Sequence, residues 1–199
     1  MNKLIYNFKS SFSKNKINPK NILGGKGANL SEMGRMGLPV PSGFTISTQA
    51  CDIFYKNKKQ IPQNLIKLIK KEITSIEKNT NKKFGDMKNP LLLSVRSGAR
   101  VSMPGMMDTI LNLGLNDKTV SALEKKTSNP KFAKDSYRRF IQMYSNVVLG
   151  IEAYNFEELI ENYKFTKGVI FDTDLDENDW DDLIRDFKNL VKIKTKKDF

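Results

Sequence analysis

The pattern of apolar residues changes near residue 116, and this change limits the fold more than any other feature of the sequence. Before it, short apolar runs between glycine-containing turns predict strands at 4–8, 44–46, 91–95 and 109–113. After it, amphipathic patterns predict helices at 117–126, 131–149, 156–164 and 177–195. We therefore predict an α+β fold: a mixed α/β lobe over residues 1–114 and an all-helical subdomain over residues 115–199.

Three helices are expected between the strands of the first lobe. One runs from Ala28 to Met36 after a turn at residues 18–21, and a second follows Ser47 or Thr48, whose hydroxyls suit a helix N-cap. The third begins near Pro62, because its apolar residues then recur every three or four positions. The strand at 91–95 is apolar apart from Ser94, which predicts a strand covered on both faces.

Composition excludes several classes of protein. A chain of 199 residues suits one domain or two small lobes. No apolar run approaches the ~18 residues of a membrane span, and residues 1–8 are too polar for a secretory signal. Cys51 is the single cysteine, so no internal disulfide can form. We expect a cytoplasmic protein without a membrane partner.

The chain contains no histidine. It therefore cannot supply a histidine nucleophile, general base or metal ligand, and with one cysteine it cannot build a zinc cluster. Any chemistry must use lysine, arginine, carboxylates, hydroxyls or backbone amides. Seven carboxylates lie between Asp172 and Asp182, but they lack the glycine and spacing of an EF-hand calcium loop. We interpret them as favourable charge at a helix N-terminus and predict no metal site.

The net charge of +12 comes mainly from 28 lysines, accompanied by only six arginines. Sequence-specific readers of nucleic acid rely on arginine forks, and these lysines are spread through residues 3–20 and 56–88. We interpret most of them as solvated surface and predict no specific nucleic-acid partner. Residues 1–100 carry a net charge of +14 and residues 101–199 a charge of −2, so the first half is the one suited to a phosphate-rich small ligand.

The first candidate site is the glycine turn formed by Gly24, Gly25 and Gly27, which leads directly into a helix. Glycines allow close approach of the backbone to a ligand, and a helix start presents N–H groups and a positive dipole end. Lys26 adds a full charge, so the turn suits a phosphate. The spacing and the missing Ser or Thr after the lysine show that it is not a Walker A loop. By itself the pattern is equally consistent with a structural turn.

The second candidate site follows the strand at 91–95. Arg96 stands at the strand end, where a guanidinium can form a fork onto two phosphate oxygens; the alternative is a structural salt bridge. A further loop then contains a Pro-Gly corner, and its position between two strands favours a mobile flap over a ligand. This loop runs from Met103 to Asp108, with Gly105 at the corner and Met106 and Met107 at the tip.

Four stretches closely resemble the family of pyruvate, phosphate dikinases. They are GGKGANLSEM at 24–33, GLPVPSGFTI at 37–46, LSVRSGARVSMPGMMDTILNLG at 93–114 and DSYRRFIQMY at 135–144. The resemblance extends over essentially all 199 residues, and the MPGMMDT stretch is specific to the family. The related phosphoenolpyruvate synthases have a similar lysine turn and arginine strand but a different flap, and dependence on phosphate would distinguish the two.

The resemblance implies the N-terminal part of an ATP-grasp nucleotide-binding domain. In this family ATP, phosphate and pyruvate give AMP, diphosphate and phosphoenolpyruvate, by way of a phosphohistidine on a separate swivelling domain. Carried onto matching positions, Lys26 and Arg96 would hold ATP phosphates, and residues 105–109 would close over them. That assignment agrees with the independent interpretation of the residues.

The sequence also departs from the family pattern. The second ATP-grasp subdomain, the phosphohistidine domain and the pyruvate-binding domain have no counterpart in these 199 residues. The Mg²⁺ ligands would lie in that second subdomain, so we expect none here. Ser145 occupies a position where we expect glycine. We therefore expect a phosphotransferase fragment that binds ATP weakly, contains no catalytic residue and is inactive alone. A basic module that binds nucleic acid is the alternative from another class.

Overall fold

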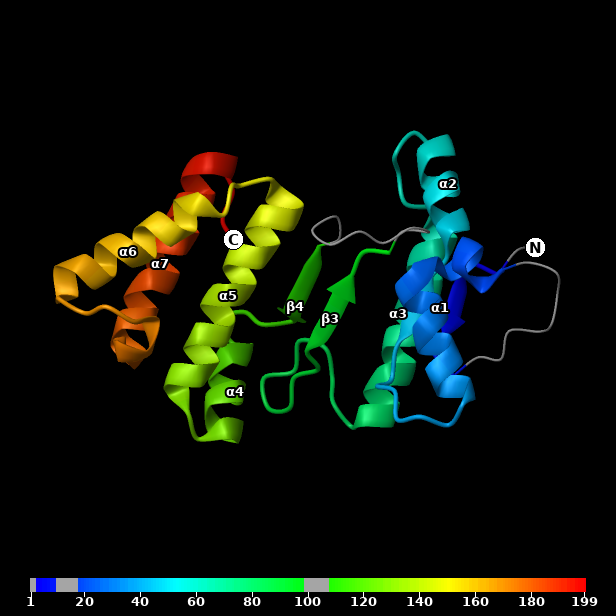
Figure 1. The fold of residues 1–199 in the computed structure, drawn as a ribbon, viewed down its shortest axis with the longest axis horizontal. Helices are drawn as coiled ribbons and strands as arrows, with labels where there is room; N and C mark the ends of the chain where they lie inside the picture. The colour runs from blue at the N-terminus through cyan, green and yellow to red at the C-terminus, as the bar shows by residue number, and fades with distance from the viewer. Residues whose placement is uncertain (1–2, 10–17, 99–107) are drawn as a thin grey trace. The chain divides into compact units, whose positions relative to one another are not determined.

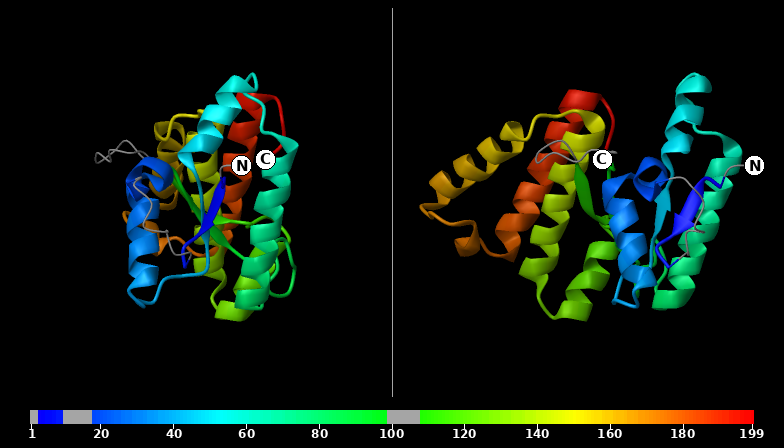
Figure 2. Two further views of the ribbon diagram at one scale, coloured as in Figure 1. Left: turned by 90° about the vertical axis from the view of Figure 1, so that its right-hand side faces the viewer. Right: turned by 45° about the vertical axis from the view of Figure 1, so that its right-hand side comes forward.

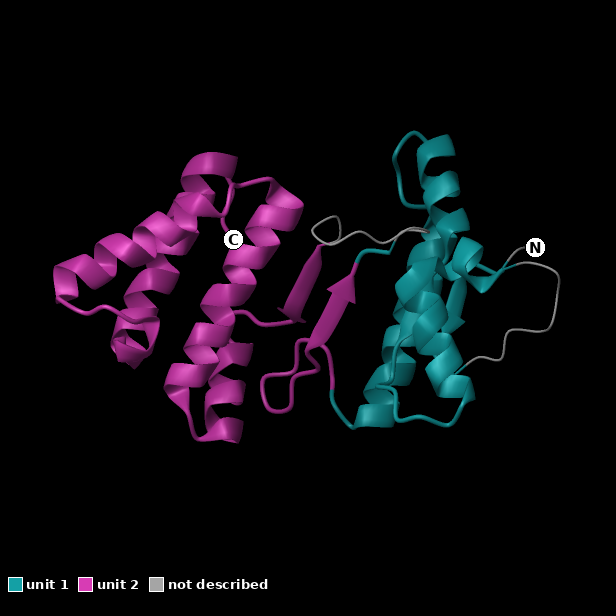
Figure 3. Cartoon of the chain, viewed as in Figure 1, with its two compact units in different colours: residues 1–82, 97–107 teal, residues 83–96, 108–199 magenta. Residues whose placement is uncertain are grey.

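The computed structural model of the chain describes residues 3–9, 18–98 and 108–199 (Figure 1). It divides into two compact units, residues 1–82 with 97–107 and residues 83–96 with 108–199 (Figure 3). Both contain helices and strands, compatible with the predicted α+β class. The predicted division at residue 114 concerns subdomains of a nucleotide-binding domain, and it stays a prediction. In the described residues, no helix is long and apolar enough to cross a membrane.

The first unit consists of one strand pair and three helices. Strands β1 (Ile5–Asn7) and β2 (Phe44–Ile46) pair antiparallel, with Tyr6 opposite Thr45. The helices are α1 (Pro19–Arg35), α2 (Thr48–Lys56) and α3 (Gln63–Thr80). The strand pair lies between α1 and α3 (Figure 2). Its small core unites Ile5, Ala50 and Leu65.

The second unit places helices against a second strand pair. Strands β3 (Leu93–Arg96) and β4 (Thr109–Leu113) are antiparallel. The helices are α4 (Thr119–Thr127), α5 (Pro130–Leu149), α6 (Tyr154–Lys167), the 3₁₀ turn η1 (Asp172–Asp174) and α7 (Glu177–Thr195). The larger core of the chain lies here, and its fully buried side chains include Phe156, Trp180 and Phe187.

Most predicted elements are confirmed, and α7 has the predicted bounds. Its start is well specified because the Asp176 side chain accepts hydrogen bonds from the backbone N–H groups of Asn178 and Asp179. The third predicted helix also follows Pro62, which is the N-cap residue of α3.

Two local predictions are wrong. Residues 18–21 form the capped start of α1 instead of a separate turn, because the Asn18 side chain accepts from the backbone N–H of Lys20 and Pro19 occupies the first helical turn. Strand β3 is not covered on both faces, since Ser94, Val95 and Arg96 are exposed. Its apolar run reflects burial of Leu91, which precedes the strand.

Ser47 is the N-cap residue of α2, but its hydroxyl makes no capping hydrogen bond. Its Oγ is buried and has no hydrogen-bond partner in the described part of the chain. The Thr48 hydroxyl donates instead to the carbonyl oxygen of Asn21 at 2.7 Å, which ties the start of α2 to the first turn of α1. The predicted position of the cap is thus correct, and the predicted contact is not formed.

Candidate functional site

Gly24 breaks α1 into two helical segments. Its φ of 68° and ψ of 171° lie outside the helical region, in a conformation that residues with a Cβ atom rarely adopt. Gly25, Lys26 and Gly27 follow this break with helical backbone angles, so the predicted three-glycine turn is confined to Gly24. Leu23 and Gly24 are buried, and Lys26 is half-buried. The local sequence therefore places Lys26 in the first turn after a backbone break.

The other glycines near this turn allow close packing. A Cβ atom on Gly27 would lie 2.9 Å from two side-chain atoms of Thr45, so the missing side chain lets α1 approach β2. A Cβ atom on Gly98 would lie 3.9 Å from the carbonyl oxygen of Leu23. Within the first unit, the glycine turn of α1 and Gly98, two residues after the end of β3, are therefore neighbours.

The β3–β4 pair brings two further predicted residues together. Arg96 lies opposite Thr109 at the last paired position of the ladder, and Asp108 directly precedes Thr109. The Arg96 side chain is exposed. The structural salt bridge considered for Arg96 has no partner among the described residues, since none of the ion pairs there includes it. Gly105, Met106 and Met107 lie outside the described residues.

Lys26 belongs to the first unit and Arg96 to the second. That both side chains bind the phosphates of one ATP molecule stays a prediction from the sequence. Lys26, like Arg96, forms no ion pair with any residue in the described ranges. Both side chains thus keep their charge uncompensated by a described carboxylate, as a phosphate ligand would require.

The acidic segment predicted to cap a helix does so. Asp179 is buried; its Oδ2 accepts from the backbone N–H of Asp176, and its Oδ1 lies 2.6 Å from the Lys167 ammonium. Burial alone would raise the pKa of Asp179, but hydrogen bonds from Lys167, the Asp176 backbone and Tyr163 outweigh it and lower that pKa. These carboxylates serve the packing of α6 against α7.

A buried cation was not anticipated from the sequence. Arg138 is 5% exposed and lies 2.6 Å from Asp135, one helical turn earlier, and 3.4 Å from Asp172. Its guanidinium covers the ring of Trp180. Burial is the main cause that lowers the pKa of Arg138, against the two carboxylates. The i, i+3 spacing of Asp135 and Arg138 was the only sign of this contact in the sequence, because Trp180 is 42 positions away.

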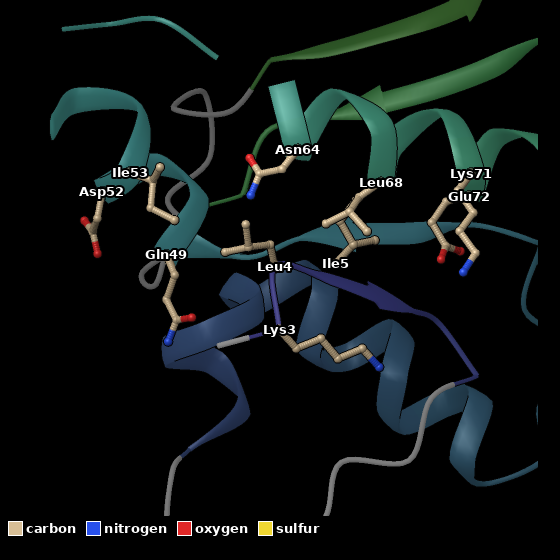
Figure 4. Close-up of a pocket in the computed structure, with 10 residues that line it drawn as sticks. All are labelled: Lys3, Leu4, Ile5, Gln49, Asp52, Ile53, Asn64, Leu68, Lys71 and Glu72. Carbon is tan, nitrogen blue, oxygen red and sulfur yellow. The ribbon is translucent and has the colours of Figure 1, made fainter. Parts of the chain in front are cut away.

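A separate cleft of about 640 Å³ opens on the first unit (Figure 4). Leu4 and Ile5, the first residue of β1, lie between residues of α2 and of α3, among them Ile53 and Leu68. The cleft has a mainly apolar lining and contains neither Lys26 nor any glycine of the turn. It is therefore distinct from the predicted phosphate-binding turn.

Comparison with known proteins identifies the family of the chain. A family profile described as "Pyruvate phosphate dikinase, AMP/ATP-binding domain" matches residues 20–70 and 57–139, which include Lys26 and Arg96. Pyruvate, phosphate dikinase from Clostridium symbiosum is 54% identical over 91% of this chain and 21% of its own length. The enzyme from Entamoeba histolytica is 50% identical over 90% of the chain and 20% of its own length.

The chloroplastic pyruvate, phosphate dikinase from Flaveria trinervia is 48% identical over 98% of the chain and 20% of its own length. The chain thus spans about a fifth of the length of these relatives. The profile covers more than half of the chain and includes both the glycine turn and the β3–β4 pair. The chain therefore belongs to the pyruvate phosphate dikinase AMP/ATP-binding domain family.

Proposed function

We propose that this chain forms the first part of an ATP-grasp nucleotide-binding domain in a pyruvate, phosphate dikinase and contributes to the binding of ATP phosphates. The observation that carries the proposal is the break at Gly24, after which the helix resumes with Lys26 in its first turn. Family membership supports the choice of nucleotide, because the matching profile is that of an AMP/ATP-binding domain.

In this proposal, Lys26 and the helix start act on the same ligand. N–H groups in a first helical turn lack partners within that turn, and the helix dipole makes this end positive. The Lys26 ammonium adds a mobile full charge. Gly24 allows the backbone to approach the phosphate, which a side chain at this position would prevent. Gly98 lies close to the carbonyl oxygen of Leu23, which supports a role for Gly98 at the same turn.

Arg96 would bind a second phosphate oxygen pair through its planar guanidinium. Thr109 lies opposite Arg96 in the strand pair, and Asp108 directly precedes it. These two residues are the C-terminal end of the proposed flap. Preorganised positive charge of this kind stabilises the charge that develops on phosphate oxygens during phosphoryl transfer. We assign no catalytic residue to this chain. The acceptor histidine would be supplied by the swivelling domain of the complete dikinase.

ATP would arrive as its magnesium complex, in which Mg²⁺ neutralises part of the phosphate charge. In the three described ranges, no three Asp, Glu, Cys or His side chains come together as a metal site. We therefore assign no Mg²⁺ ligand to a described residue and propose that the ligands belong to the second ATP-grasp subdomain. On this basis the chain alone would bind ATP weakly and would not transfer a phosphoryl group.

Thermal unfolding with increasing Mg·ATP tests the proposal. A ligand that binds only the folded state raises the melting temperature as its concentration rises. We expect a small increase at millimolar Mg·ATP, which Lys26→Ala or Arg96→Ala abolishes. Arg35→Ala is the matched control, because Arg35 is an exposed cation near the end of the same helix as Lys26. An increase that survives both substitutions would show that ATP binds elsewhere.

A further inference from the structure

The excess of positive over negative charge in the chain is confined to one compact unit. Residues 1–82 and 97–107 contain 16 lysines and arginines but only four carboxylates, whereas residues 83–96 and 108–199 contain 18 of each. The net charge of +12 therefore belongs entirely to the first unit, and the second is neutral. Lysine-rich composition alone does not explain this separation, since both units are rich in lysine.

The ion pairs follow the same division. Among the described residues, the ion pairs join residues between 117 and 198. The acidic segment of the second unit is used there: Asp172 pairs with Lys164, Asp179 with Lys167 and Asp181 with Lys134. No lysine or arginine in the described part of the first unit takes part in these pairs. The excess positive charge of that unit can therefore attract an anionic molecule.

The lysines of α3 gather on one face of that helix. Successive residues of an α-helix are about 100° apart, so Lys67, Lys70, Lys71 and Lys78 fall within an arc of about 100° that spans about 16 Å along the axis. All four side chains are exposed, and none forms an ion pair with a described residue. No carboxylate of α3 lies within the arc. We call these four residues the α3 lysine face.

The opposite side of α3 is occupied by the core. Leu65 is buried against Ile5 of β1, and Ile69 packs on the same cluster. The apolar face of α3 is thus unavailable to a lipid bilayer, which a surface helix binds by inserting that face. The α3 lysine face also contains no arginine and no aromatic residue to read or stack on bases.

We propose that the α3 lysine face binds the phosphate backbone of nucleic acid without sequence specificity. A straight row of point charges suits a linear polyanion, whose condensed counterions are released when lysines replace them. The row supplies attraction but no fork or stacking platform, so binding depends on salt and not on base sequence. This activity is separate from ATP binding at Lys26 and Arg96.

Fluorescence anisotropy with labelled 20-nucleotide DNA, single- or double-stranded and of mixed sequence, tests the proposal. At 50 mM KCl we expect binding that weakens as salt rises, with a slope of log K against log [salt] of about −3 to −4. The variant with Lys67, Lys70, Lys71 and Lys78 all changed to Gln should bind about tenfold or more weakly, with a slope near zero.

The matched control changes four exposed lysines of the second unit, Lys118, Lys125, Lys194 and Lys197, to Gln. Both quadruple variants have the same net charge, so only the position of the charge differs. Binding should be retained in the control. Equal loss in both variants, or absence of binding by the unsubstituted chain at 50 mM KCl, would overturn the proposal.

Two further measurements separate this proposal from its competitors. Binding to vesicles containing phosphatidylserine, lost with the α3 lysine face, together with failure to bind DNA would assign the face to a lipid surface and reject nucleic acid. Circular dichroism should show that the variant remains folded. Its melting temperature should still respond to Mg·ATP as the unsubstituted chain does, because Lys26 and Arg96 are intact.

Discussion

The guanidinium of Arg138 lies over the indole ring of Trp180, with Cζ 4.6 Å from the ring centroid. This contact joins α5 to α7 in the core of the second unit, and Asp135 and Asp172 hold the guanidinium in place. Arg138→Ala removes the stacking and leaves a cavity, so we expect a loss of about 2–3 kcal/mol in the free energy of unfolding.

Urea unfolding followed by the fluorescence of Trp180, the only tryptophan of the chain, measures this loss. Arg185→Ala is the control, because Arg185 is exposed and pairs only within α7; its expected effect is below about 0.5 kcal/mol. Equal effects of the two substitutions would show that stacking on Trp180 contributes nothing to stability.

Gly24→Ala tests the strained backbone of the glycine turn. An alanine cannot adopt φ 68° and ψ 171° without strain, which costs about 1–3 kcal/mol. We expect faster hydrogen exchange of the α1 amides and loss of any stabilisation by Mg·ATP. Gly25→Ala is the control for stability, since Gly25 has helical backbone angles and alanine favours a helix. Unchanged exchange in Gly24→Ala would contradict the requirement for glycine.

Asp179→Asn tests the pH dependence created by the α6–α7 contact. The pKa of Asp179 is lower in the folded chain than its ordinary value of 3.8, so the folded state binds its proton less readily. The stabilisation is therefore complete above about pH 4 and is lost as the pH falls through the folded-state pKa. The substitution should lower the free energy of unfolding by more at pH 7 than at pH 2.

The urea midpoint at both pH values measures this difference. Asp186→Asn is the control, because Asp186 lies on the same helix and makes no ion pair with a described residue. It should have the same small effect at both values. A loss in Asp179→Asn that is as large at pH 2 as at pH 7 would show that the carboxylate acts through packing and not through charge.

Ser145→Ala is expected to stabilise the second unit. Ser145 is fully buried in α5, and its Oγ has no hydrogen-bond partner among the described residues. Removing an unpaired buried hydroxyl and introducing a better helix former should raise the free energy of unfolding by about 1 kcal/mol. Ser121→Ala, at an exposed position of α4, reports the effect of helix preference alone.

The difference between the two serine substitutions in urea unfolding then isolates the buried hydroxyl. Ser145→Gly should be about 1 kcal/mol less stable than Ser145→Ala, because glycine disfavours a helix interior. If Ser145→Ala is no more stabilising than Ser121→Ala, the hydroxyl does not carry the expected desolvation cost.

Local sequence determined the elements whose start and period are both encoded nearby. The bounds of α7 were predictable because Asp176 caps the helix and its apolar residues repeat at helical spacing. Gly24 and Lys26 were predictable as a turn entering a helix, since glycine conformation is a local property. The family followed from four local stretches, of which the matching profile includes those at 24–33, 37–46 and 93–114 in full.

Tertiary structure decided which faces are covered and which charges are compensated. The apolar run at 91–95 did not reveal that Val95 is exposed, because coverage of a strand depends on distant elements. Arg138 and Trp180 are 42 positions apart. Lys164 and Lys167 of α6 form ion pairs, whereas the lysines of α3 form none with a described residue. Burial and charge pairing are properties of neighbours in space, which periodicity along the chain does not encode.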